Sequence, residues 1–353
     1  LKDASASAIY GSRATAGVIL ITTKRGKKGR STINYDSWVG WTQPVRLLDV
    51  FNAEQYMESK NEAIVNLNQN IQALTGTYGT NVEGSFRPTT IDGKTVDTKW
   101  YDYVYQTGFS HSNTISFSGG TDKSSYYLSL GHTEQKGMLK NNEFNRTNVR
   151  LNLDHKVYKN FTVGVNMGFS NALNAAPNSG SLPGSAFATA GLGRLPLVLP
   201  PNVSPFNADG SYNLNGAGIG AGANVNPTNG TSPLVTGYYN PALIIDKNTF
   251  TSESSQIQGS VFAAWEIIKG LTVRTTYGID NTGYEDISFS TGLGGDGYST
   301  QGSASNFYRT NKRWNWQNTA QYDKTFAEKH NVSLLVGGEQ QYSETLRWGA
   351  NRT

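Results

Sequence analysis

The chain has 353 residues, no cysteine and a formal net charge of +4. These values exclude disulfides, zinc–thiolate sites and a cysteine nucleophile, and the charge is too small to indicate nucleic-acid binding. Glycine, tyrosine and asparagine are abundant and only 16% of residues are charged, which favours strands and turns over long helices. No apolar run approaches the roughly 18 residues of a membrane helix, but the alternating strands of a membrane barrel would not produce one.

The first 30 residues begin with small side chains that lead through a glycine turn into the apolar run from Val18 to Ile21. That run has no polar face, so we expect a strand that is covered on both sides. The basic residues from Lys24 to Arg30 follow it, and we interpret them as a solvated connection to the next element.

Alternation of apolar and polar residues with a period of two predicts nine strands in the rest of the chain. Several of them approach the 9–11 residues with which a tilted strand crosses a bilayer. The predicted stretches are 33–41, 115–117, 126–130, 146–154, 161–169, 257–267, 271–279, 314–326 and 332–336.

The connections between these strands alternate between long and short. Long links cover 42–111, 172–253 and 282–312, with a medium one at 135–143, and short turns at 121–124, 159–160, 269–270 and 328–330 separate them. Outer-membrane barrels sort their connections in this way, with periplasmic turns and long extracellular loops, whereas a soluble sandwich has no reason to do so. The sequence therefore predicts an all-β fold, a transmembrane antiparallel β-barrel.

One helix is expected in the first long link. Residues 54–74 carry apolar side chains at three- and four-residue spacing, and Asn52 is a suitable N-cap. This helix is expected either to pack over the barrel mouth or to dock a partner.

Nine strands do not close a bacterial single-chain barrel, which uses an even number, and a half barrel would leave unpaired edges in lipid. We therefore expect the chain to be a fragment of a longer polypeptide.

A family resemblance is carried by the amino-terminal segment. The stretch LKDASASAIYGSRATAGVILITTKRGKKG resembles the plug end of TonB-dependent receptors, where the pattern AIYGS…GVI.I.TK precedes the first barrel strand. It resembles in particular the SusC/RagA family of Bacteroidetes nutrient importers, and the similarity continues to about residue 170. The residues of the plug motif are Ala8, Ile9, Tyr10, Gly11, Ser12, Arg13, Gly17, Val18, Thr22 and Lys24.

The resemblance implies that residues 1–30 end a plug domain and that residues 31–353 begin the barrel, supplying about nine strands of a 22-stranded, plugged type. It implies TonB-dependent import of a bulky nutrient, a glycan or an oligopeptide, across the bacterial outer membrane. The implied partners are a SusD-like surface lipoprotein that acts as a lid and TonB, which would contact a segment outside this chain. Two alternatives stay open: a siderophore or cobalamin receptor, and a soluble or secreted β-rich glycan-binding or adhesion protein.

The sequence contains no recognisable catalytic constellation, and its four histidines lack metal-ligand spacing. We therefore expect no enzymatic activity, no cofactor and no metal. The best candidates for substrate contacts are loop aromatics, because sugars stack their CH faces on rings, although each ring could instead stabilise its own loop. These candidates are Trp100, Tyr101, Tyr103, Tyr238, Tyr239, Tyr284, Tyr298 and Tyr308.

Overall fold

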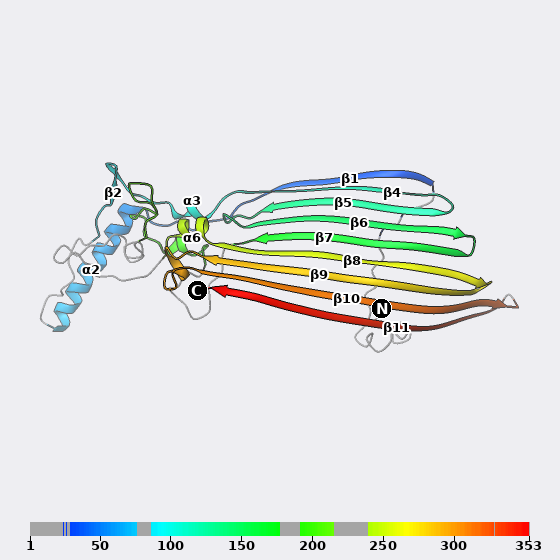
Figure 1. The fold of residues 1–353 in the computed structure, drawn as a ribbon. Coiled ribbons are helices and arrows are strands. Elements are labelled where there is room, and N and C mark those ends of the chain that lie inside the picture. The colour runs from blue at the N-terminus through cyan, green and yellow to red at the C-terminus, as the bar shows by residue number, and fades with distance from the viewer. Residues whose placement is uncertain are drawn as a thin grey trace.

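A computed structural model describes residues 24, 26, 29–75, 86–176, 191–214, 239–327 and 329–352. Its main element is a sheet of nine antiparallel strands, each paired with its neighbours in chain order (Figure 1). The predicted all-β architecture and all nine predicted strands are confirmed. The strands are β1 (Gly29–Thr42), β4 (Gly108–Gly120), β5 (Ser124–Lys136), β6 (Glu143–Tyr158), β7 (Phe161–Ala175), β8 (Thr249–Ile268), β9 (Leu271–Ser290), β10 (Ser303–Phe326) and β11 (His330–Arg352).

The described helices and a two-stranded hairpin lie in the long connections. No helix in the described ranges is both long and apolar enough to span a membrane. These elements are α2 (Ala53–Thr75), β2 (Thr90–Ile91), β3 (Lys94–Thr95), α3 (Trp100–Val104), α4 (Leu195–Val198), α6 (Pro241–Lys247) and the 3-10 turn η3 (Gly295–Gly297).

The sheet has two chemically different faces because successive residues of a strand point to opposite sides. One side, the apolar face, carries Val165 of β7, Val261 of β8 and Tyr277 of β9, which lie in one register row. The other side, the polar face, carries Asn166 of β7 opposite Ser260 of β8. Each strand is thus amphipathic in the way that its sequence indicated.

Short turns join the strands at one end of the sheet. In the β4–β5 turn the Thr121 hydroxyl accepts hydrogen bonds from the backbone N–H groups of Lys123 (3.2 Å) and Ser124 (3.1 Å). The β8–β9 turn requires glycine at Gly270, because φ is +87° there and a Cβ would lie 2.3 Å from the Asp323 carbonyl oxygen. The four predicted short turns are confirmed.

The long connections lie at the opposite end, where α2, α3 and α6 are found (Figure 1). They are shorter than predicted, since every flanking strand extends further into them. The prediction of a loop over 282–312 is wrong in extent: β9 and β10 stay paired up to Ser290 and Ser303. At Asn281, Gly283 and Glu285 the apolar face of β9 carries no apolar side chain, so the alternation is interrupted there although the hydrogen-bond ladder continues.

Three of these connections share one apolar core, named the loop core. Hydrogen bonds join the three connections: the backbone N–H of Lys140 donates to the Val104 carbonyl of α3 (3.0 Å), and the Asn141 amide donates to the Ile245 carbonyl of α6 (2.6 Å). The loops are therefore one folded body beyond the sheet. The loop core consists of Trp100, Val104, Leu139, Leu192, Leu195, Leu199, Val203, Ile244 and Ile245.

Helix α2 starts at the predicted cap, Asn52, and the structure shows that the cap is reciprocal. The Asn52 side chain accepts from the Gln55 N–H (2.9 Å), and the Gln55 side chain accepts from the Asn52 N–H (3.2 Å). Farther along, the Asn61 amide exchanges two hydrogen bonds with the Phe86 backbone (3.0 and 3.1 Å), and Ile64 is buried. The helix is thus anchored at its start and by the segment at residue 86.

We expect Asn52→Ala to destabilise the first turn of α2 by about 1 kcal/mol, because the backbone N–H of Gln55 loses the side-chain oxygen that accepts from it. Hydrogen exchange of the amides at residues 53–56 would measure this as faster exchange. Asn66→Ala, at an exposed position inside the same helix, is the control and should not accelerate exchange. Equal effects of the two substitutions would contradict the capping role.

Candidate functional site

A band of exposed apolar side chains crosses the apolar face next to the short turns. It runs from Phe161 to Phe169 on β7 and from Ile257 to Ile267 on β8. Val261, near the middle of the band, is 50% exposed. The length of the band on each strand matches the 9–11 residues with which a tilted strand spans a bilayer, so this face is suited to contact lipid.

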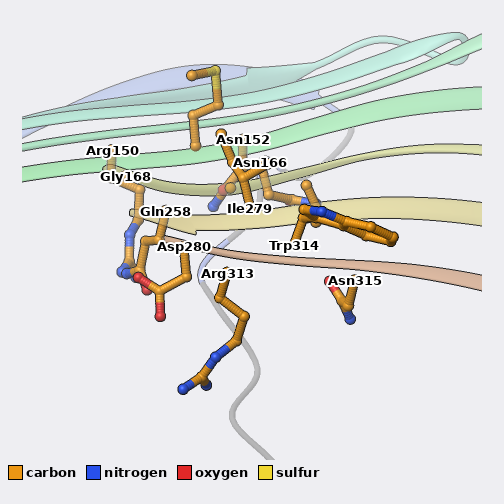
Figure 2. A pocket seen from close by; sticks show the side chains of 14 residues that line it. Arg150, Asn152, Asn166, Gly168, Gln258, Ile279, Asp280, Arg313, Trp314 and Asn315 are labelled. Carbon is orange, nitrogen blue, oxygen red and sulfur yellow. The ribbon is translucent and has the colours of Figure 1, made fainter. Parts of the chain in front are cut away.

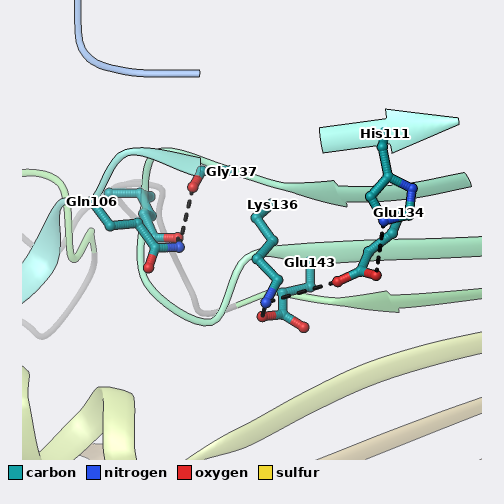
Figure 3. Close-up of polar contacts among 7 residues, drawn as sticks. Gln106, His111, Glu134, Lys136, Gly137 and Glu143 are labelled. Carbon is teal, nitrogen blue, oxygen red and sulfur yellow. Dashed lines mark hydrogen bonds and ion pairs between the residues drawn. The ribbon is translucent and has the colours of Figure 1, made fainter. Parts of the chain in front are cut away.

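On β4–β6 a charged cluster marks the edge of this band that is nearer the long connections (Figure 3). The His111 ring lies 3.5 Å from the Glu134 carboxylate, and the Lys136 ammonium lies 3.8 Å from Glu134 and 3.7 Å from Glu143. His111 lies on the same face of the sheet as Ile115, and Ile115 is four residues farther along β4 toward the short turns. Ion pairs of this kind are costly in hydrocarbon. The parts of these strands nearer the long connections therefore lie beyond the apolar zone.

Aromatic rings continue the apolar face on β9–β11, in the register rows of Gly259 and Val261. The ring of Trp314 stacks between Tyr277 (6.0 Å between centroids) and Tyr342 (6.2 Å), and the Trp316 indole N–H donates to the Thr275 hydroxyl (2.9 Å). The apolar surface therefore extends across β9–β11 as well.

The polar face is organised as straight rows across the strands. In one row, Arg150 of β6 is followed in register by Gly168, Gln258, Asp280 and Arg313 of β7 to β10. Figure 2 shows the side chains of Arg150, Gln258, Asp280 and Arg313 directed to the same side of the sheet. The row is rich in groups that donate and accept hydrogen bonds but holds no apolar side chain.

The neighbouring row consists of amides, a hydroxyl and a glycine: Asn152, Asn166, Ser260, Gly278 and Asn315. The two rows line a shallow hollow of about 470 Å³. At Gly278 a Cβ would lie 2.2 Å from the Asn315 side-chain oxygen, so a larger residue there would displace the Asn315 amide. The surface can bind a polar solute through hydrogen bonds. The described residues contain no cluster of three or more potential metal ligands among His, Asp and Glu.

The predicted plug motif lies outside the described residues except for Lys24. The Asn152 amide of the polar face donates to the Lys24 carbonyl at 2.7 Å. The end of the segment 1–30 therefore contacts the polar face, next to the hollow.

Three predicted substrate residues are in or beside α3, and their surroundings are structural. Trp100 is only 3% exposed, and its indole N–H donates to the Pro200 carbonyl (2.9 Å), so it is a core residue with no ring face for a sugar. Tyr103 packs against the loop core. Tyr101 donates to the Leu48 carbonyl (2.9 Å), and burial, with a smaller effect of neighbouring Tyr and Asp charges, raises the pKa of its phenol.

The other predicted aromatics do not gather into one site. Tyr238 lies outside the described residues, Tyr239 packs against the loop core, and Tyr298 is 69% exposed near η3. Tyr284 and Tyr308 are on strands rather than in a loop, and they point to opposite faces. The sequence analysis missed the arginine and amide rows: the alternation places these polar residues on one face of each strand, but only the strand register brings them into rows.

No protein-family model matches the chain. The chain is 28% identical to the TonB-dependent receptor P3 of Formosa agariphila, over 97% of its own length and 30% of the relative. It is 26% identical to the TonB-dependent receptor SusC of Bacteroides thetaiotaomicron, over 97% of its length and 32% of the relative. The chain thus spans about a third of the curated relatives that it matches.

Solved structures agree with these relatives. The RagAB peptide importer in its open-open state matches 99% of this chain and 38% of the solved chain, with a TM-score of 0.69 and 26% identity. The closed-closed state gives a TM-score of 0.67. The resemblance to SusC/RagA-type TonB-dependent receptors is therefore confirmed over nearly the whole chain. The relatives named here are receptors and importers, not enzymes, in agreement with the expectation from the sequence.

Proposed function

We propose that this chain, which is similar to SusC and RagA along nearly its whole length, forms part of the barrel wall of a TonB-dependent importer in the bacterial outer membrane. Its cargo is a bulky nutrient, a glycan or an oligopeptide. The chain performs no covalent chemistry: it separates lipid from a polar passage and presents large loops outside the cell.

The observation that carries this proposal is the two-faced sheet. An exposed apolar band of bilayer width covers one face, and continuous rows of amide and charged side chains cover the other. A soluble sheet would bury its apolar face against a second layer, whereas a membrane barrel exposes that face to lipid and lines its lumen with polar side chains.

Two further features support the division of the chain and its partners. The contact of Lys24 with Asn152 supports residues 1–30 as the end of a plug inside the barrel, followed by the wall in residues 31–353. The loop core is a folded body at the mouth on which a SusD-like lipoprotein lid would rest. TonB would act through the plug, outside this chain.

The test is to extract the intact protein from its native membranes. After a high-salt wash we expect it to stay in the membrane fraction and to dissolve only in detergent, together with a surface lipoprotein. Uptake of its labelled nutrient should stop when TonB is removed from the cell.

Recovery without detergent would overturn the barrel assignment, because the apolar band would then be covered by protein. A barrel that purifies without a lipoprotein and takes up an iron chelate would instead identify a siderophore-type receptor.

A further inference from the structure

On the half of the polar face that is nearer the long connections, positive side chains outnumber negative ones. On β6–β11, from the row of Arg150 to the loop end, this half carries five arginines but only two acidic residues, Asp280 and Asp286. The five arginines are Arg146, Arg150, Arg309, Arg313 and Arg347.

The arginines form two rows. Arg150 and Arg313 lie in the row that also contains Asp280, and Arg146, Arg309 and Arg347 lie in a row four residues nearer the loop end, about 13 Å away at 3.3 Å per residue. A molecule that moves along this wall therefore meets guanidinium groups at two successive heights.

None of these arginines forms an ion pair or a side-chain hydrogen bond within the described ranges of the chain. Both acidic residues accept hydrogen bonds from uncharged neighbours: Asp280 from Gln256 (2.8 Å) and Asp286 from Ser252 (2.6 Å). The Arg309 guanidinium lies over the Tyr284 ring at 4.4 Å, which holds it in place without neutralising its charge. The positive charges are thus available to a solute.

We propose that these two arginine rows select an anionic oligosaccharide, one that carries carboxylate or sulfate groups, as the imported nutrient. The inference rests on the proposed function and narrows its cargo. Planar guanidinium groups bind carboxylate and sulfate oxygens with paired hydrogen bonds, which suits anions spaced along a chain.

The surroundings favour a glycan over an acidic peptide. The rows next to the arginines consist of amide and hydroxyl side chains such as Asn152 and Ser260, which match the dense hydroxyl groups of a sugar. Two aromatic rings lie on the same face, in or beside the arginine row that is nearer the loop end. They belong to Tyr284 and to Phe307, which is 49% exposed. Sugar rings can stack on them while their acid groups reach the arginines.

The test measures binding to the intact detergent-solubilised protein, with any lipoprotein that purifies with it. The probes are oligogalacturonate, a sulfated heparin-derived oligosaccharide, the neutral methyl ester of oligogalacturonate and oligoglutamate. We expect at least one acidic glycan to bind and the neutral ester to bind far more weakly. Arg309→Gln and Arg313→Gln should each weaken binding of that glycan roughly tenfold, and added salt should weaken it further.

Lys312→Gln is the matched control, because Lys312 adjoins Arg313 on β10 but points to the opposite face. It removes the same charge and should leave binding unchanged. A heat-dependent shift in gel migration, as given by a folded barrel, verifies each variant.

Three results would overturn the inference: no binding of either acidic glycan, equal binding of the acid and its ester with no effect of the arginine substitutions, or arginine-dependent binding of oligoglutamate instead, which would identify an acidic peptide. Membrane extraction and TonB-dependent uptake test the proposed importer separately, so that proposal can stand when this one fails.

Discussion

Replacing Trp100 by alanine is expected to destabilise the loop core by about 3–5 kcal/mol. The indole is 3% exposed, it packs with Tyr103, and its N–H group donates to the Pro200 carbonyl. Truncation leaves a cavity among residues from three connections and one buried carbonyl without its donor. Hydrogen exchange of the α3 and α6 amides would record the loss as local opening, since the loop core can unfold while the strand ladder stays intact.

The control is Tyr298→Ala, which removes a loop aromatic that is 69% exposed and should change stability by no more than about 0.5 kcal/mol. Trp100→Phe should fall between the two, because it keeps most of the ring volume but lacks the N–H donor. If the α3 amides exchange no faster in Trp100→Ala, Trp100 is not a core residue and its role as a ligand contact is open again.

An arginine in the middle of the apolar band should be similarly damaging. We expect Val261→Arg to destabilise the protein in lipid by about 2–4 kcal/mol, because the guanidinium would enter the hydrocarbon. Val261 is half exposed and lies between Val165 and Tyr277 in register, so the substitution disturbs little protein packing. Denaturant unfolding of the intact protein in lipid vesicles measures the difference.

Ser255→Arg is the matched control on the same strand and the same face. Ser255 pairs with Asn171 and Gly283, six residues or about 20 Å farther along the strand and past Ile257, the last residue of the band on β8. Its substitution should cost no more than about 1 kcal/mol. Equal costs at both positions would show that no hydrocarbon boundary lies between them.

The strands were predictable because each carries its own alternation, a local property of the sequence. Phe161–Phe169 of β7 shows this, as does the helix that starts at Asn52 with its local cap. The ends of the strands were not predictable. From Asp280 to Asp286 the side chains on both faces are mainly polar, and the hydrogen-bond ladders with β8 and β10 keep β9 extended to Ser290. Pairing between distant segments thus overrides the absence of a local pattern.

The candidate site shows the same division. Aromatic composition indicated substrate contacts in loops, but an isolated Trp or Tyr has no property that tells a ligand contact from a core residue. Trp100 became a core residue because segments near Leu139, Leu199 and Ile244 fold over it. The arginine rows were hidden for a related reason, since Arg150 and Arg313 are 163 positions apart in the sequence and share a row only through the register of five strands.

The sequence by itself determined the all-β class, the nine strands, the short turns and the resemblance at the amino terminus, because these depend on residues close together in the chain. Only the tertiary structure decided how far the strands extend, which aromatics are buried in the loop core, and which polar side chains meet in rows on one face. Those features depend on strand register and on packing between loops, where the interacting residues are distant in the sequence and no local periodicity records their contact.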